Sequence, residues 1–135
     1  MCLERHKMGL RLLLADDERD FVDTLAERLR LRDYDVQVVY DGAEAIRAVT
    51  ADKPDLVVLD LFMPGLPGDE AIRQLKMMYP AMPIILLTGH QAVDDTGISP
   101  ISQAFACLTK PLAFKDFVAT VEAAIRGSAT QGNEK

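Results

Sequence analysis

The chain has 135 residues, of which 49% are hydrophobic and 27% charged, a size and composition typical of one globular domain rather than a disordered or fibrous chain. Its 21 acidic residues outnumber 15 basic ones, which leaves a net charge of -6 and no basic run suited to binding nucleic acid. Because the chain has no apolar run near the roughly 20 residues of a membrane span, no leader-like segment and no CxxC pair, we expect a cytoplasmic protein that does not bind membranes.

The first predicted units are two strands, each followed by a helix. Residues 11–15 (RLLLA) are apolar enough for a strand buried on both faces. Residues 19–32 carry apolar side chains at three- and four-residue steps, which predicts an amphipathic helix. Residues 35–40 (DVQVVY) are β-rich and predict a second strand, after which Asp41 caps a short helix that ends at residue 50.

The middle of the chain contains the clearest strand. Residues 56–59 (LVVL) form an unbroken apolar run that ends at Asp60, as expected for a central parallel strand. The next segment, LFMPGLPG, holds two prolines and two glycines and predicts a shaped turn. A helix over residues 69–79 follows, and then a fourth strand over residues 84–87 (IILL) that ends at Thr88.

The last part of the chain contains a fifth strand and a final helix. Residues 106–109 (ACLT) predict the strand, which ends at Lys110, and residues 113–126 have the apolar spacing of an amphipathic helix. Between the fourth and fifth strands, Gly97 and Pro100 interrupt the helical pattern, so we expect the fourth of five helices to be short or irregular.

Strands separated by helix-length segments imply right-handed crossovers and a parallel sheet with helices on both faces. We therefore predict an α/β fold: a single three-layer, doubly wound domain with a five-stranded parallel sheet. The expected organisation is a flexible N-terminal extension over residues 1–9, the domain over residues 10–127, and a polar tail or start of a linker over residues 128–135.

Polar side chains follow four of the five predicted strands: Asp16 and Asp17, Asp60, Thr88 and Lys110. Because ligands of open α/β sheets bind at the carboxyl ends of the strands, we expect these residues to meet in one cleft. Three carboxylates in one place repel each other, and a hard cation such as Mg²⁺ would relieve that repulsion. A lysine and a cation beside Asp60 would suit phosphoryl transfer to that carboxylate.

Four segments, LLLADDE, LVVLDLFMPGLPG, IILLTG and LTKP, occur in this order and together resemble the receiver domain of bacterial two-component response regulators over residues 12–125. The resemblance implies a flavodoxin-like fold, similar to that of chemotaxis regulators, with strand order 2-1-3-4-5. It also implies a signalling phosphoacceptor rather than an enzyme: a domain that takes a phosphoryl group from a sensor histidine kinase or histidine phosphotransfer protein and then switches its binding to a partner. Phosphorylation and dephosphorylation would be self-catalysed.

The resemblance assigns roles at the cleft. Asp60 would be the phosphoacceptor, and Mg²⁺ would be held by Asp16, Asp17, Asp60 and the backbone carbonyl of Phe62. Lys110 would pair with a phosphoryl oxygen.

The resemblance also implies switch and turn positions. Thr88 would move its hydroxyl toward the phosphoryl group and couple the chemistry to nearby loops. The Lys110–Pro111 peptide bond would be cis.

The sequence departs from the family pattern near the fifth strand. Three positions before the lysine, where the family usually carries Tyr or Phe, this chain has Cys107, and the nearest aromatic, Phe105, has the wrong strand parity. We therefore expect switching without the usual aromatic rotation, and a monomer or weak dimer. In the family that this chain resembles, the positions of Phe62 and His90 shape access of the water that hydrolyses the aspartyl phosphate. The resemblance implies that the bulk of Phe62 slows hydrolysis and that His90 opposes this by polarising water.

Other interpretations remain open at this point. Taken alone, Asp16, Asp17 and Glu18 could simply cap the first helix. A Mg²⁺-dependent phosphohydrolase with an aspartyl phosphate intermediate is the main alternative function, although the chain has no room for the cap insertion of such enzymes. A receiver fragment of a larger transcriptional regulator or hybrid kinase is another. A flavodoxin-like cofactor site is disfavoured, because the acidic ADDERD segment would repel phosphate.

Overall fold

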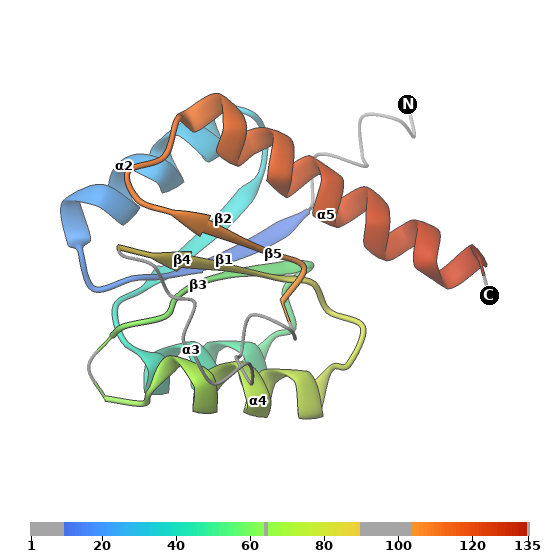
Figure 1. The fold of residues 1–135 in the computed structure, drawn as a ribbon, viewed down its shortest axis with the longest axis horizontal. Coiled ribbons are helices and arrows are strands. Elements are labelled where there is room, and N and C mark those ends of the chain that lie inside the picture. Colours follow the sequence, from blue (N-terminus) through green and yellow to red (C-terminus); the bar gives the residue numbers. More distant parts are fainter. Residues whose placement is uncertain (1–9, 64, 90–103, 135) are drawn as a thin grey trace.

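A computed structural model describes residues 10–63, 65–89 and 104–134. Its centre is a parallel sheet of five strands in the order β2-β1-β3-β4-β5, which confirms the predicted order (Figure 1). The strands are β1 (Arg11–Ala15), β2 (Asp35–Val39), β3 (Leu56–Asp60), β4 (Ile84–Thr88) and β5 (Ala106–Thr109).

Helices cover both faces of the sheet, as predicted. Helices α2 (Arg19–Arg30) and α5 (Phe114–Glu134) lie on one face, and α3 (Gly42–Ala51) and α4 (Gly68–Met78) lie on the other (Figure 1). The predicted short fourth helix, between β4 and β5, falls within residues 90–103, outside the described residues.

The two faces of the sheet form two apolar cores because side chains alternate along each strand. On β1, Leu12 and Leu14 pack with α2 and α5, whereas Leu13 packs with α3 and α4. Every residue of β3 and β4 is buried, as expected for central strands covered on both sides.

Two helix ends differ by two or more residues from their predicted positions. Helix α2 ends at Arg30, so Leu31, which was expected on its apolar face, is 82% exposed. The chain reverses there because Asp33 adopts a positive φ of 75° and Tyr34 turns into the core. Helix α5 continues beyond the predicted end at Arg126 to Glu134, over a segment that contains no proline to stop it.

Asp41 caps α3 as predicted. Its Oδ1 atom accepts a hydrogen bond of 2.8 Å from the backbone N–H of Glu44.

None of the helices in the described residues has the length and apolar character needed to cross a membrane.

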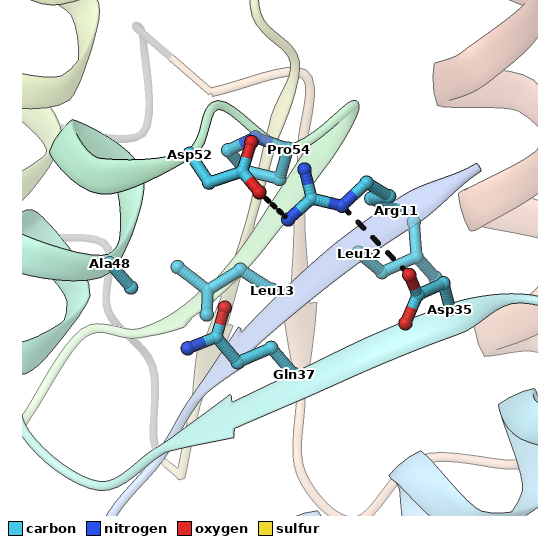
Figure 2. A pocket seen from close by; sticks show the side chains of 8 residues that line it. All are labelled: Arg11, Leu12, Leu13, Asp35, Gln37, Ala48, Asp52 and Pro54. Carbon is cyan, nitrogen blue, oxygen red and sulfur yellow. Dashed lines mark ion pairs between the residues drawn. The ribbon is translucent and has the colours of Figure 1, made fainter. Parts of the chain in front are cut away.

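At the amino-terminal edge of the sheet, Arg11 joins three parts of the chain. Its guanidinium lies 2.8 Å from the Asp52 carboxylate and 3.9 Å from that of Asp35 (Figure 2). Its backbone N–H donates to Asp55 at 2.8 Å. These contacts connect the start of β1 to β2 and to the α3–β3 loop, at the edge opposite the carboxyl ends of the strands.

Candidate functional site

The carboxyl edge of the sheet brings three aspartates together. Asp60 is the last residue of β3 and Asp16 directly follows β1, and these strands pair with Ala15 opposite Leu59. Asp16 and Asp60 are therefore side by side and buried, while Asp17 is exposed. One carboxylate oxygen of each aspartate lies within 4.8 Å of the others.

Each buried carboxylate is anchored through one oxygen. Asp16 Oδ1 accepts a hydrogen bond from the backbone N–H of Glu18 at 2.9 Å, and Asp60 Oδ1 accepts one from the backbone N–H of Phe62 at 3.1 Å. The second oxygens face Lys110 Nζ, at 2.9 Å from Asp16 Oδ2 and 3.5 Å from Asp60 Oδ2. Each carboxylate is thus oriented with one oxygen on a backbone N–H and the other directed toward Lys110.

Lys110 reaches the cluster of three aspartates from the end of β5. Its backbone N–H donates to the carbonyl of Thr88 at 2.7 Å, which places the residue directly after β5. Its ammonium lies 2.6 Å from Glu18 Oε1 and 4.6 Å from the centre of the Phe21 ring. The Lys110–Pro111 peptide bond is cis.

The charges in the cluster shift each other's ionisation. Burial and the negative charge of Asp16 raise the pKa of the Asp60 carboxyl, the Phe62 N–H and Lys110 oppose the rise, and the net effect moves the pKa from 3.8 to about 6. Burial also acts to lower the pKa of Lys110, but the carboxylates of Glu18, Asp16 and Asp60 outweigh it, so that the pKa lies above its ordinary value. The site holds more negative charge than its one ammonium neutralises.

These residues fit a divalent metal ion. Asp16 Oδ2 is buried, and apart from its ion pair with Lys110 it accepts no hydrogen bond from the described residues. Together with Asp17 and Asp60 it offers the hard oxygen donors that Mg²⁺ prefers, and the exposed side of Asp17 leaves space for water ligands.

The other residues singled out in the sequence lie around this cluster. Thr88 is the last residue of β4 and is fully buried; it follows Leu87, which pairs with Asp60 across the sheet. Cys107 is half-buried on β5, where burial raises the pKa of its thiol. His90 lies outside the described residues.

An open cleft surrounds the cluster. Its lining residues combine acidic and apolar residues with one lysine: Asp17, Glu18, Phe21, Asp60, Phe62, Gly89, Lys110 and Pro111. Phe62 is 62% exposed at its rim. Asp60 therefore lines an open cleft even though its side chain is almost buried.

Sequence reasoning missed the contacts of Glu18 and Phe21 with Lys110. Glu18 occupies the N-cap position of α2, but its side chain makes no capping hydrogen bond. Helix capping therefore does not explain the position of the Glu18 side chain. The spacing of the two residues, three positions apart at the start of a helix, was the available signal that they share one side of it.

Comparisons with known proteins found a family model and curated relatives that match most of this chain. The family model for the response regulator receiver domain matches residues 12–122. The response regulator MprA from Mycobacterium ulcerans is 33% identical over 127 residues, covering 94% of this chain and 55% of that protein. The transcriptional regulatory protein PrrA from Mycobacterium tuberculosis is 35% identical over 127 residues, covering 92% and 54%. The chain spans about half the length of these curated relatives.

Solved structures match over most of the chain. A CheY-like receiver domain protein from Methanospirillum hungatei superposes with a TM-score of 0.84 at 21% identity, covering 90% of this chain and 97% of that one, and shows the fold alone. A receiver domain protein from Clostridium thermocellum has a TM-score of 0.80 at 28% identity, covering 90% and 98%. NtrX from Brucella abortus, in complex with ATP, has a TM-score of 0.84 at 26% identity, covering 93% and 29%.

Proposed function

The chain belongs to the response regulator receiver family, the phosphoacceptors of two-component signalling, and from this we propose that Asp60 is the residue that accepts the phosphoryl group. One observation carries the assignment: a nearly buried carboxylate ends the central strand, beside an ammonium at 3.5 Å and two further carboxylates suited to a metal. Asp16 has the same charged neighbours, but it follows β1, whereas Asp60 ends the central strand β3.

The reaction follows from these positions. An Asp60 oxygen attacks phosphorus, the P–N bond of the donor phosphohistidine breaks, and its electron pair stays on the imidazole nitrogen. Mg²⁺ held by Asp16, Asp17, Asp60 and the Phe62 carbonyl would neutralise charge on the transferred phosphoryl oxygens. Lys110 neutralises another oxygen and stabilises the aspartyl phosphate.

The partners follow from the same proposal. The donor is a sensor histidine kinase or a histidine phosphotransfer protein, and the domain catalyses its own phosphorylation and dephosphorylation. Phosphorylation adds charge and acceptor oxygens at the end of β3. Thr88, buried at the end of the neighbouring strand, turns its hydroxyl toward them and couples the chemistry to a change in partner binding.

The half-length match to PrrA supports a second candidate role. PrrA is a transcriptional regulatory protein by name, and the alignment covers 54% of it. A receiver that controls the output of a longer transcriptional regulator is therefore the alternative setting for the same chemistry. A phosphohydrolase is disfavoured, because the receiver family match extends over residues 12–122.

The test is intact-protein mass after incubation with acetyl phosphate, with and without Mg²⁺. We expect a gain of about 80 Da, one phosphoryl group, that requires the metal and is absent in Asp60→Ala. Modification that persists in Asp60→Ala or that ignores the metal would overturn the assignment of Asp60.

A further inference from the structure

The Lys110 ammonium has closer carboxylate neighbours than the proposed phosphoacceptor. Nζ lies 2.6 Å from Glu18 Oε1 and 2.9 Å from Asp16 Oδ2, but 3.5 Å from Asp60 Oδ2. Asp16 is accounted for as a metal ligand. Glu18 has no part in the chemistry proposed above.

The side chain of Glu18 is not needed for the local fold. At the N-cap of α2 it makes no capping hydrogen bond, and it is its backbone N–H that binds Asp16. The side chain is 60% exposed, whereas that of its partner Lys110 is 13% exposed. Glu18 therefore reaches from the rim of the cleft toward a lysine that is held inside it.

A second contact holds the lysine in the same direction. Nζ lies 4.6 Å from the centre of the Phe21 ring, within the range of a cation–π interaction. Glu18 is the N-cap of α2 and Phe21 lies in its first turn, so both contacts tie the ammonium to the start of α2. The distance from the ammonium to Asp60 is longer than that to Glu18.

We propose that Glu18 is a positioning residue that holds Lys110 on the α2 side of the cleft and thereby slows phosphoryl transfer to Asp60. The proposal rests on the proposed function of Asp60 and adds a control on its rate. To stabilise the phosphoryl oxygens, the ammonium must give up or share its contact with Glu18. Because Glu18 is largely exposed, the restraint is moderate and weakens as salt screens the pair.

The first measurement is the rate of phosphorylation by acetyl phosphate in Mg²⁺, for wild type and Glu18→Gln. We expect the variant to react about two- to fivefold faster at low salt, the range that an exposed ion pair can supply. Added salt should bring the wild-type rate toward that of the variant. An equal or slower rate in Glu18→Gln would overturn the proposal.

Asp20→Asn is the matched control. Asp20 is an exposed acid in the same first turn of α2, so its removal lowers the repulsion of an anionic donor by a similar amount without altering a Lys110 contact. A rate increase in Asp20→Asn as large as that in Glu18→Gln would assign the effect to net charge and overturn the proposal.

A second measurement needs no phosphorylation. The Phe21 ring should shift the NMR signals of the Lys110 side-chain methylene next to the ammonium, because the lysine lies over the ring. We expect these signals to move toward free-lysine values in Glu18→Gln but not in Asp20→Asn; unchanged signals in Glu18→Gln would overturn the proposal. If wild type accepts no phosphoryl group, the proposed function fails, and the NMR shifts still decide where Glu18 holds Lys110.

Discussion

Asp60 places a carboxylate where the folded protein disfavours negative charge. The residue is 4% exposed and lies beside Asp16, and these two effects raise its pKa to about 6. A single ammonium at 3.5 Å and one backbone N–H oppose them. The Asp60 carboxylate is therefore destabilised by burial and by repulsion from Asp16. A bound cation, or a loss of charge at Asp60, relieves this electrostatic strain.

The strain predicts how stability depends on pH. Because the folded-state pKa of Asp60 is about 6, above the ordinary 3.8, the folded protein binds more protons between these values. The free energy of unfolding of metal-free wild type should therefore fall as pH rises through this window, by about 1–3 kcal/mol from this residue.

Asp60→Asn removes the charge and keeps an oxygen for the Phe62 N–H. In chelator we expect it to raise the free energy of unfolding by about 1–3 kcal/mol near pH 7.5 and to change little near pH 4. Urea unfolding at both pH values measures this, with the exposed Asp20→Asn as control. A loss of stability near pH 7.5 would mean that attraction to Lys110 outweighs burial and repulsion.

At the scale of elements, the loop between β3 and α4 holds the backbone that contacts Asp60. Gly65 adopts a positive φ of 88° in this loop, which favours glycine. Gly68, the first residue of α4, packs so closely on Leu61 that an added Cβ would lie 2.2 Å from the Leu61 carbonyl oxygen. Leu61 directly follows the proposed phosphoacceptor, so this close approach positions the loop at the cleft.

Gly68→Ala tests the close approach, because helix propensity and packing predict opposite signs. Propensity alone favours alanine in a helix by about 1 kcal/mol, whereas the contact with a backbone atom should cost about 1–3 kcal/mol. We expect net destabilisation in urea unfolding and slower phosphorylation, since Leu61 must move. Gly89→Ala is the control for stability, because a Cβ there meets nothing within 4 Å. Equal stability of the two variants would contradict the argument.

At the scale of the whole molecule, the edge formed by the carboxyl ends of the strands and the edge formed by their amino-terminal ends have different roles. The carboxyl edge gathers the acidic cleft, and the amino-terminal edge carries the ion pairs of Arg11 with Asp35 and Asp52 (Figure 2). The two edges lie at opposite ends of β1, separated by apolar residues buried in both cores. A change at one edge should therefore leave the chemistry at the other intact.

Arg11→Ala tests this separation. The acidic partners are mostly exposed, so we expect a loss of about 1 kcal/mol or less in the free energy of unfolding. The rate of phosphorylation by acetyl phosphate should not change. If fully folded Arg11→Ala were phosphorylated more slowly than wild type, the amino-terminal edge of the sheet would be shown to influence the cleft.

The sequence alone determined the fold class, the strand order through its family resemblance, and the proximity of the aspartates. An apolar run that ends in a polar residue is a local pattern that predicts a buried strand and its end. Because the carboxyl ends of parallel strands lie at the same end of the sheet, these polar residues are predicted to form one site. Asp16, Asp17, Asp60 and Lys110 all follow or end predicted strands, so this rule alone identifies them.

Only the tertiary structure decided which charges meet and how closely. The Lys110–Glu18 contact joins residues 92 positions apart, and its length depends on side-chain conformations that no local pattern encodes. The raised pKa of Asp60 likewise depends on burial and on the orientation of Asp16. The same limit applies to the ends of α2 and α5, because packing and turn geometry, rather than helix propensity, determine where a helix ends.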